Sequence, residues 1–386
     1  MYKIIFADRE EKILKILKRI LETENGNLKT FFFNDAEEAA AALSESDVDM
    51  VVCDLDMYVD SGQPLLDYTK ENYPGVIRVI LTGYSLEATA LQAIQKAHQL
   101  FLKPIESFQL KDKIYKTLSL KEYIQNENLR KLIAGINEIP VLPEFYYKLE
   151  KMLEQPDVSI AEVKNLIAHD PALVAKILQL VNSAFFGFSK NISDLTQAIS
   201  FLGLKIIKTL VLYLSVTATI KIAPQLLKVQ NEIWHHSLTA ASIARDIAKE
   251  LHFTQDEIDN AYAAGILHDI GKLVLLSYNN YYEEVTERSK TLQCSFYEAE
   301  LSYFNTSHGD VGAYLLGLWG LPDLIVESVH YHHHELFKDD DEVNIKSVLQ
   351  ITELVSRDDL PDPEEIIKNY IIENPKRSNK SQDNFN

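Results

Sequence analysis

The sequence predicts two structural classes in succession, an α/β region followed by an all-α region. Residues 1 to about 120 alternate short apolar runs with segments of helical period, which is typical of a parallel sheet covered by helices. Residues from about 139 to 335 show helical periods joined by short turns, with no convincing strand. Nine of the eleven histidines lie from His235 onward, so the chemistry divides in the same way. We therefore expect a five-stranded doubly wound domain and a separate helical domain.

Five short apolar runs in the first region predict the strands of the sheet. A segment of helical period from Ile13 to Leu21 separates the first two runs, and Asn25-Gly26 signals the end of that helix. The expected strands are Lys3–Ala7, Lys29–Phe33, Met50–Cys53, Val76–Leu81 and Gln99–Leu102. In a doubly wound sheet the ligand site lies beyond the carboxyl ends of the strands. The polar residues at those ends are Asp8, Asp54, Thr82 and Lys103.

The helical pattern continues from about Phe108 to Ala134, until Ile139–Pro143 interrupts it with two prolines. This break divides the chain into five expected parts. They are an α/β domain over residues 1–120, a helical connector over 121–138, an all-helical domain over 139–335, a helical extension over 336–373 and a disordered tail over 374–386. We expect disorder in the tail because it is polar and has no apolar anchors.

Composition limits the class of function. With 46% hydrophobic and 25% charged residues, the chain is typical of a globular protein. Its net charge of −19 repels phosphate backbones, so we expect no nucleic-acid partner. The two cysteines are too few for a disulfide framework, and no segment has the pattern of a signal peptide or a membrane-spanning helix. We therefore expect a cytoplasmic protein without a membrane partner.

Three strings at the strand ends of the first region form a recognisable set. They are Val51–Asp54, Thr82-Gly83 and Lys103-Pro104, and Gly62 follows Asp54 by eight residues. Together they resemble the receiver domain of bacterial response regulators, which has a flavodoxin-like fold, over residues 1 to about 120. The resemblance implies that the Asp54 carboxylate is the phosphoacceptor and that a cognate histidine kinase supplies the phosphoryl group.

The resemblance to receiver domains also assigns roles to the rest of the pocket. Asp8 and Glu10 would hold Mg²⁺ through their carboxylates. Lys103 would pair with the phosphoryl oxygens, and Thr82 would hydrogen-bond the phosphate. These roles describe phosphoryl transfer to a carboxylate, with the cations neutralising the charge of the phosphate.

Two positions in the first region differ from the receiver pattern. Arg9 stands where the family usually has a second acidic residue, and Leu100 stands at the usual aromatic position, with Phe101 displaced by one. A cation fixed at the metal position would repel Mg²⁺, although Glu10, or an Arg9 side chain that turns away, would restore binding. The alternative is a receiver fold that serves as a docking or dimerisation module without phosphorylation.

The second region carries a second recognisable set of strings. They are Ile139–Pro143, His169–Leu173, Leu180–Gly187, Ala198–Gly203, Trp234–Ser237, Ala264–Lys272, His308 with Gly312, Trp319–Pro322 and Tyr331–His333. Asp170-Pro171 lies in one of them and is also a helix-start signal, because Asp caps free amides and Pro suits the first helical position. Together the strings resemble the HDOD family, the HD-related output domain of bacterial signalling proteins, over about 132 to 335.

HDOD domains are related to the HD and HD-GYP phosphohydrolases, and this sequence keeps positions that bind metal in those enzymes. Glu353 stands where the last metal-binding aspartate is expected, and no Gly-Tyr-Pro string follows the histidines. Imidazole and carboxylate ligands suit Fe, Mn or Zn. The candidate ligands are His236, His268, Asp269, His308, His332, His333 and Glu353.

Three functions are therefore open. The HDOD resemblance implies a response regulator whose helical domain has no catalytic residues and acts by binding another signalling protein. The candidate ligands instead favour a metal-dependent phosphohydrolase acting on a cyclic dinucleotide. Arg9 and Leu100 favour a scaffold that needs no phosphorylation. A homodimer is compatible with each of them.

Overall fold

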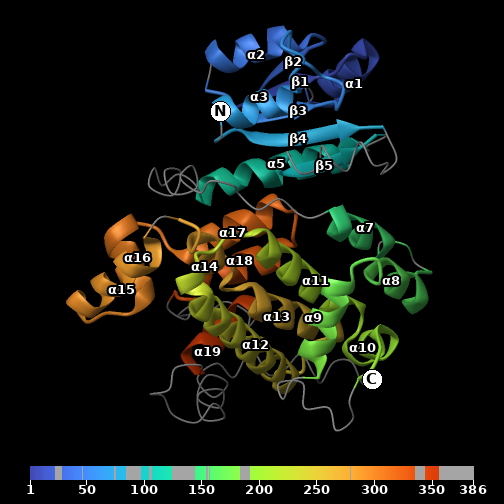
Figure 1. Cartoon of the computed structure of the whole chain (residues 1–386). Helices are drawn as coiled ribbons and strands as arrows, with labels where there is room; N and C mark the ends of the chain where they lie inside the picture. Colours follow the sequence, from blue (N-terminus) through green and yellow to red (C-terminus); the bar gives the residue numbers. More distant parts are fainter. Residues whose placement is uncertain are drawn as a thin grey trace, which may run out of the picture. The chain divides into compact units, whose positions relative to one another are not determined.

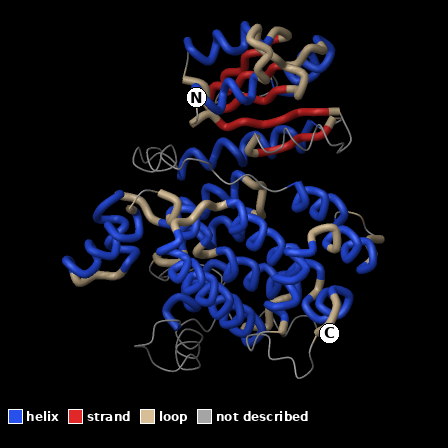
Figure 2. Tube along the Cα trace, in the orientation of Figure 1, coloured by secondary structure: helices blue, strands red, loops and turns tan. Residues whose placement is uncertain are grey.

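The chain forms two compact units, and the main boundary between them follows Lys148. In the computed structural model, the strands of the described residues all belong to the first unit, whereas the second is helical (Figure 2). The structure describes residues 1–21, 28–45, 47–73, 75–83, 97–103, 107–123, 144–153, 155, 157–182, 192–278, 280–334 and 344–355.

The first unit contains a five-stranded parallel sheet with the strand order β2-β1-β3-β4-β5 (Figure 1). Its strands are β1 (Tyr2–Ala7), β2 (Leu28–Phe33), β3 (Met50–Cys53), β4 (Ile77–Thr82) and β5 (Gln99–Leu102). Each lies within one residue of a run expected from the sequence, so the predicted doubly wound sheet is confirmed. The order reverses between β1 and β3, where such folds place their ligand site.

The strands of the first unit are largely continuous apolar runs, and because successive side chains point to opposite faces, apolar residues cover both faces of the sheet. Ile5, Ala7 and Val51 belong to one buried cluster with α2 and α3. Their neighbours Ile4 and Phe6 are also fully buried, and by alternation they face the other side of the sheet. The helices of this unit are α1 (Glu11–Leu21), α2 (Ala36–Glu45), α3 (Leu65–Asn72) and α5 (Ser107–Tyr123).

Helix α5 confirms the first part of the helix expected from Phe108 to Ala134. The remainder, together with most of the proposed connector over 121–138, lies outside the described residues. The Asn25-Gly26 signal also lies outside them.

The second unit is a helical domain in which α12 packs lengthwise on α13 (Figure 1). The described residues of this unit contain no strand, in agreement with the sequence. Its helices are α7 (Glu144–Leu153), α8 (Ile160–Ile167), α9 (Pro171–Val181), α10 (Leu195–Leu202), α11 (Leu204–Thr219), η1 (Pro224–Leu226), α12 (Leu227–Glu250), α13 (Gln255–Leu267), α14 (Ile270–Leu275), α15 (Tyr281–Leu292), α16 (Phe296–Phe304), α17 (His308–Leu318), α18 (Asp323–Tyr331) and α19 (Ile345–Val355).

Side-chain caps determine where several of these helices begin. The Asp170 carboxylate accepts hydrogen bonds from the amides of Ala172 and Leu173, and Pro171 is the first residue of α9, as the Asp-Pro signal predicts. Thr254 forms a capping box with Glu257 at the start of α13. Such caps satisfy amides that the helix leaves free, so each start is specified locally.

Glycines allow the helices around the candidate metal residues to approach closely. A Cβ atom on Gly265 would lie 2.5 Å from the Cα atom of Ala241, so glycine lets α13 pack against α12. A Cβ on Gly271 would overlap the carbonyl oxygen of His308 and lie 2.8 Å from the amide nitrogen of Gly312. This contact holds the start of α14 against the start of α17.

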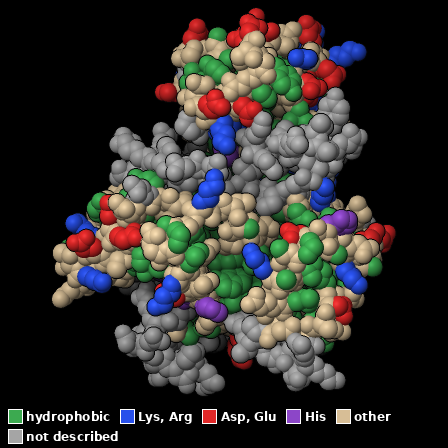
Figure 3. Space-filling view, viewed as in Figure 1, with side chains coloured by type: hydrophobic (Ala, Val, Ile, Leu, Met, Phe, Trp, Pro, Cys, Tyr) green, Lys and Arg blue, Asp and Glu red, His purple; other side chains and the backbone are tan. Residues whose placement is uncertain are grey.

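The expected extension over 336–373 contains α19 in its described part, and the tail over 374–386 lies outside that part. Within the described residues, no single helix has the length and apolarity to cross a membrane, although the pair α10 and α11, bent by 114°, passes the test of length and composition. On the face in Figure 3, described Lys and Arg side chains are scattered rather than gathered in one patch.

Candidate functional sites

The receiver pocket lies at the carboxyl ends of β1, β3, β4 and β5. The Lys103 ammonium lies 2.5 Å from a carboxylate oxygen of Asp8 and 2.5 Å from one of Asp54. Thr82 is buried at the end of β4, and its carbonyl oxygen accepts a hydrogen bond from the Lys103 amide. The structure thus brings these four predicted residues together, although they lie up to 95 positions apart in the chain.

The segment after β1 leaves Arg9 exposed beside a buried Asp8. The Glu10 amide donates a hydrogen bond of 2.9 Å to the Asp8 carboxylate, and the Glu10 side chain is exposed as well. An exposed guanidinium is screened by water, so its repulsion of a cation near Asp8 is weak. Arg9 therefore does not fill the pocket with positive charge.

The charges of the receiver pocket depend on one another. Burial alone would lower the pKa of Lys103, but hydrogen bonds and charges from Asp54 and Asp8 outweigh it and raise the pKa above its ordinary value. Lys103 is therefore a fixed cation that neutralises part of the carboxylate charge. The second oxygen of Asp54 accepts a hydrogen bond of 3.2 Å from the Asp56 amide. The Asp54 carboxylate is consequently held in place by a side chain and by the backbone.

All seven candidate metal ligands of the helical domain converge on one cluster. His236 comes from α12, and His268 and Asp269 join α13 to α14. His308 begins α17, and the other three come from the end of α18 and from α19. Within the described residues, three overlapping triads bring one potential ligand atom from each member within 4.8 Å of the others. They are His308, His332 and His333; His236, His268 and Glu353; and His268, Asp269 and His332.

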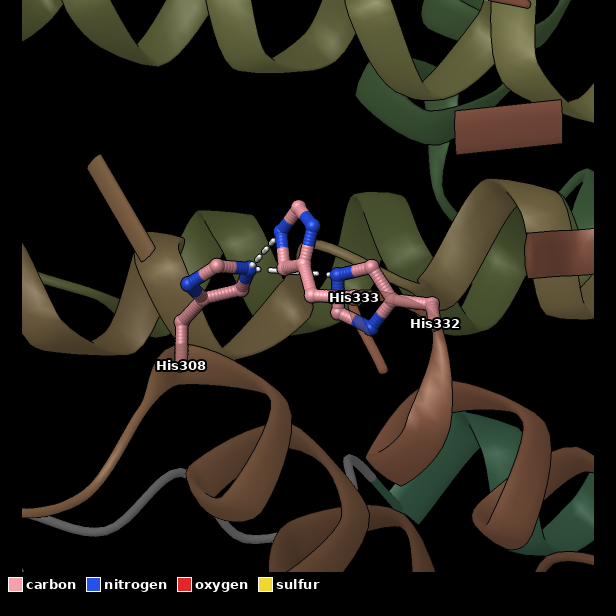
Figure 4. Close-up of side chains that lie close together, drawn as sticks. All are labelled: His308, His332 and His333. Carbon is pink, nitrogen blue, oxygen red and sulfur yellow. Dashed lines mark hydrogen bonds between the residues drawn. The ribbon is translucent and has the colours of Figure 1, made fainter. Parts of the chain in front are cut away.

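The His308 group is a tight set of imidazole nitrogens. The Nε2 atom of His308 lies 3.1 Å from Nε2 of His332 and 3.0 Å from Nε2 of His333, as the dashed lines in Figure 4 mark. The backbone of α17 begins at His308 because the Ser307 hydroxyl and the Asp310 carboxylate cap each other's amides.

Asp269 links the two groups of histidines. Its Oδ1 atom lies 3.3 Å from Nε2 of His308, and its Oδ2 atom lies 3.5 Å from Nε2 of His268. Oδ2 also accepts a hydrogen bond of 2.9 Å from the Lys272 ammonium. Glu353 also contacts both groups, with Oε1 at 3.1 Å from Nε2 of His268 and 3.4 Å from Nε2 of His236, and Oε2 at 3.7 Å from Nδ1 of His333.

The protonation equilibria of the cluster favour ionised carboxylates. Burial alone would raise the pKa of Asp269, but the charges of His268 and Lys272 hold it well below its usual range. Burial would likewise raise the pKa of Glu353, but the neighbouring imidazoles of His236 and His268 hold that pKa well below its usual range. Burial and the nearby His308 lower the pKa of His332 to about 3, so this imidazole stays neutral. A neutral imidazole keeps a lone pair for a metal.

The donor set of the cluster fits a transition-metal cation. Within the described part of the chain, four buried ligand atoms make no well-aligned hydrogen bond, although other polar atoms lie close to them. A buried polar atom without such a bond ordinarily costs about 1–3 kcal/mol. Divalent cations bound among the three triads would satisfy such atoms, because all are nitrogen or oxygen ligands of the type that Fe, Mn and Zn accept. The atoms are Nε2 of His268, Oδ1 of Asp269, Nδ1 of His333 and Oε1 of Glu353.

Glu300 and Tyr281 also belong to this site, and the sequence did not predict them. Both side chains are buried, and Glu300 accepts hydrogen bonds from His308 and from the Tyr281 hydroxyl. Glu300 lies two residues after Glu298, an exposed carboxylate that caps α16. No local pattern distinguishes the two glutamates, because their difference arises from the packing of α16.

Two models of known families match this chain, one in each half. The model of the response regulator receiver domain matches residues 4–115, and that of the HDOD domain matches residues 139–335, about half of the chain. The chain belongs to the HDOD family. The receiver domain ahead of the HDOD domain is the domain order of a response regulator with an HD-related output domain. Receiver domains interact with a phosphodonor such as a histidine kinase, and they typically bind Mg²⁺.

Individual relatives of this HDOD protein are distant. An uncharacterized protein of Treponema pallidum is 28% identical over 202 residues, which cover 52% of this chain and 38% of the relative. The hydrogenase transcriptional regulatory protein HoxA of Cupriavidus necator is 26% identical over 103 residues, which cover 26% of this chain and 21% of that protein. The chain therefore spans well under half the length of these two relatives.

A solved structure shares the fold of the HDOD protein. It is an HDOD domain protein of unknown function from Geobacter sulfurreducens, with 23% identity and a TM-score of 0.52. The likeness covers 71% of this chain and 90% of the other. At this level of identity it supports the fold alone.

Proposed function

We propose that a histidine kinase phosphorylates Asp54 of this response regulator and that the HDOD domain transmits the signal by binding another protein. The observation that carries the proposal is the position of the Asp54 carboxylate at the switch point of the sheet, within reach of the Lys103 ammonium. Attack of an Asp54 oxygen on a phosphohistidine would form an acyl phosphate and release the imidazole.

Mg²⁺ would be held by Asp8 and Asp54, with Glu10 close by. Bound there, it would neutralise charge on the incoming phosphoryl group. Lys103 now pairs with both carboxylates and would turn to the phosphoryl oxygens after transfer. The exposed position of Arg9 supports phosphorylation over the alternative of a scaffold, because that side chain leaves the pocket free.

A small phosphodonor with Mg²⁺ tests this proposal through the intact mass of the protein. The wild type should gain one phosphoryl group, and Asp54→Asn should gain none, because an amide lacks the nucleophilic carboxylate. Asp56→Asn is a suitable control, because that side chain is exposed and should leave the mass gain unchanged. If the wild type gains no mass while Arg9→Asp does, Arg9 has disabled the pocket and the scaffold function replaces this one.

We also propose that the seven-residue cluster holds Fe, Mn or Zn. The unpartnered ligand atoms support a bound cation, and their burial supports a role in stability. For the output we favour protein binding, since the HDOD resemblance implies it and no Gly-Tyr-Pro string is present. The second candidate is hydrolysis of a phosphodiester, which the convergence of the seven ligands favours.

Two measurements distinguish these outputs. Elemental mass spectrometry of the purified protein should find a transition metal in the wild type and little in Asp269→Ala. Incubation with cyclic dinucleotides should give no hydrolysis beyond the background of Asp269→Ala. Turnover that requires the metal, and that disappears in a folded Asp269→Ala protein, would establish the phosphohydrolase instead.

A further inference from the structure

Glu300 is a fully buried carboxylate, and its two oxygens accept hydrogen bonds from two different residues. Its Oε2 atom accepts bonds from the backbone amide of His308 at 3.2 Å and from Nδ1 of the same residue at 2.6 Å. Its Oε1 atom accepts a hydrogen bond from the hydroxyl of Tyr281, which is also buried. Both Glu300 and Tyr281 belong to the pair of helices α15 and α16, outside the elements that supply the seven ligands.

These contacts determine which nitrogen of His308 carries a proton. Oε2 of Glu300 is a hydrogen-bond acceptor, as its bond from the backbone amide of His308 indicates. Nδ1 of His308 contacts the same oxygen, so Nδ1 must carry a proton and donate it. The other nitrogen, Nε2, then faces the cluster, where Nε2 of His332, Nε2 of His333 and Oδ1 of Asp269 lie 3.0–3.3 Å away. Nε2 is therefore the nitrogen of His308 that would ligate a cation held among these atoms.

We propose that Glu300 is a positioning residue for a divalent transition-metal cation at this cluster. It holds His308 in the tautomer that has Nδ1 protonated, and Tyr281 keeps the carboxylate from rotating. The inference rests on the metal-binding part of the proposed function and adds to it a second layer of residues from α15 and α16. A carboxylate behind a metal-ligating imidazole orients the ring and makes it a stronger base.

Metal affinity tests the role of Glu300. In competition with a chelator, Glu300→Gln in the full chain should bind Zn²⁺ about 10 to 100 times more weakly than the wild type. Tyr281→Phe should weaken binding in the same direction but less, and it remains a test if Glu300→Gln does not fold. Glu287→Gln, on the exposed face of α15, should bind Zn²⁺ as the wild type does.

A second readout needs no metal. The short contact between His308 Nδ1 and Glu300 should give a far-downfield imidazole N–H signal in the proton NMR spectrum of metal-stripped wild type, absent in His308→Gln and shifted upfield in Glu300→Gln. If the wild type shows this signal but binds no Zn²⁺, both the metal centre and the role of Glu300 in it are wrong. If the wild type binds Zn²⁺ and Glu300→Gln binds it equally well, the metal centre stands and the positioning role is overturned.

Discussion

Lys103 neutralises part of the carboxylate charge in the receiver pocket. It is the ammonium that contacts both Asp8 and Asp54, and all three side chains are at most 14% exposed. Two carboxylates this close to one cation are stabilised together, and each would repel the other without it. The pocket is thus arranged so that a second cation, such as Mg²⁺, adds to a site that is already negative.

Replacing Lys103 with methionine should destabilise the receiver domain. We expect a loss of about 2 kcal/mol, because two largely buried carboxylates lose their shared cation. Mg²⁺ should restore part of this loss by binding the folded domain. Urea unfolding monitored by hydrogen exchange of β1 and β3 measures both effects. Lys15→Met is the control, because the exposed ion pair of Lys15 with Glu11 contributes little to stability. An equal loss of stability in both variants would contradict the prediction.

His98 should make the stability of the receiver domain depend on pH. Burial, then the neighbouring Arg78, lowers the pKa of His98 well below its usual value. Below about pH 6.5 the unfolded chain takes up a proton that the folded domain does not, so stability should fall with pH by up to about 1.4 kcal/mol per unit. His98→Gln should remove this slope, whereas His169→Gln, an exposed control, should keep it. The measurement is hydrogen exchange in β4 and β5 at several pH values, corrected for the intrinsic exchange rate. If His98→Gln keeps the wild-type dependence of stability on pH, His98 is not its cause.

At the scale of elements, backbone contacts between helices place the ligands of the helical domain. The start of α14 meets the start of α17 at Gly271, so Asp269 and His308 are brought together by two backbones rather than by long side chains. The same principle applies at Gly265, where α13 approaches α12. Ligands carried on such rigid crossings vary little in position.

Gly271→Ala should therefore reduce both stability and metal binding. The added Cβ meets the carbonyl oxygen of His308, so we expect a loss of about 1–3 kcal/mol, which outweighs the helix propensity gained with alanine. Thermal unfolding and Zn²⁺ titration test this. A Cβ on Gly75 would meet no atom within 4 Å, so Gly75→Ala should leave both values near those of the wild type. A stable Gly271→Ala protein with normal metal affinity would show that the crossing can relax.

The sequence predicted the elements better than it predicted the site. Continuous apolar runs such as Met50–Cys53 identify buried parallel strands, and Asp170-Pro171 identifies a helix start, because both signals are local. The four residues of the receiver pocket were predictable because parallel strands end at one edge. Glu300 was not predictable from the sequence, because its contact with His308 depends on how α16 packs.

At the scale of the whole molecule, the two domains carry different kinds of ligand. The receiver domain offers oxygen ligands from Asp8 and Asp54, which suit Mg²⁺, whereas the helical cluster is rich in imidazole, which suits softer cations. The proposed domain boundaries at 120 and 139 are bridged by residues outside the described ranges, so the boundaries themselves stay predictions.

A chelator selective for transition metals, used with Mg²⁺ retained, should destabilise only the helical domain. At metal concentrations of 100 to 1,000 times the dissociation constant, bound metal stabilises by about 3–4 kcal/mol, and this should be lost. Hydrogen exchange should quicken in α13 and α17 and stay unchanged in β1 and β3. Asp269→Asn should not respond to the chelator. Equal protection of α13 before and after chelation would mean that no metal supports the fold.

His236 sets the cluster apart from an entirely closed site. Of the residues that surround Asp269, it keeps 34% of its side chain exposed, whereas His268 and His308 have none. Among the described candidate ligands, His236 is therefore the most open to solvent. If an ion enters past this imidazole on α12, a change at His236 should alter the rate of metal exchange more than it alters the affinity that the buried ligands set.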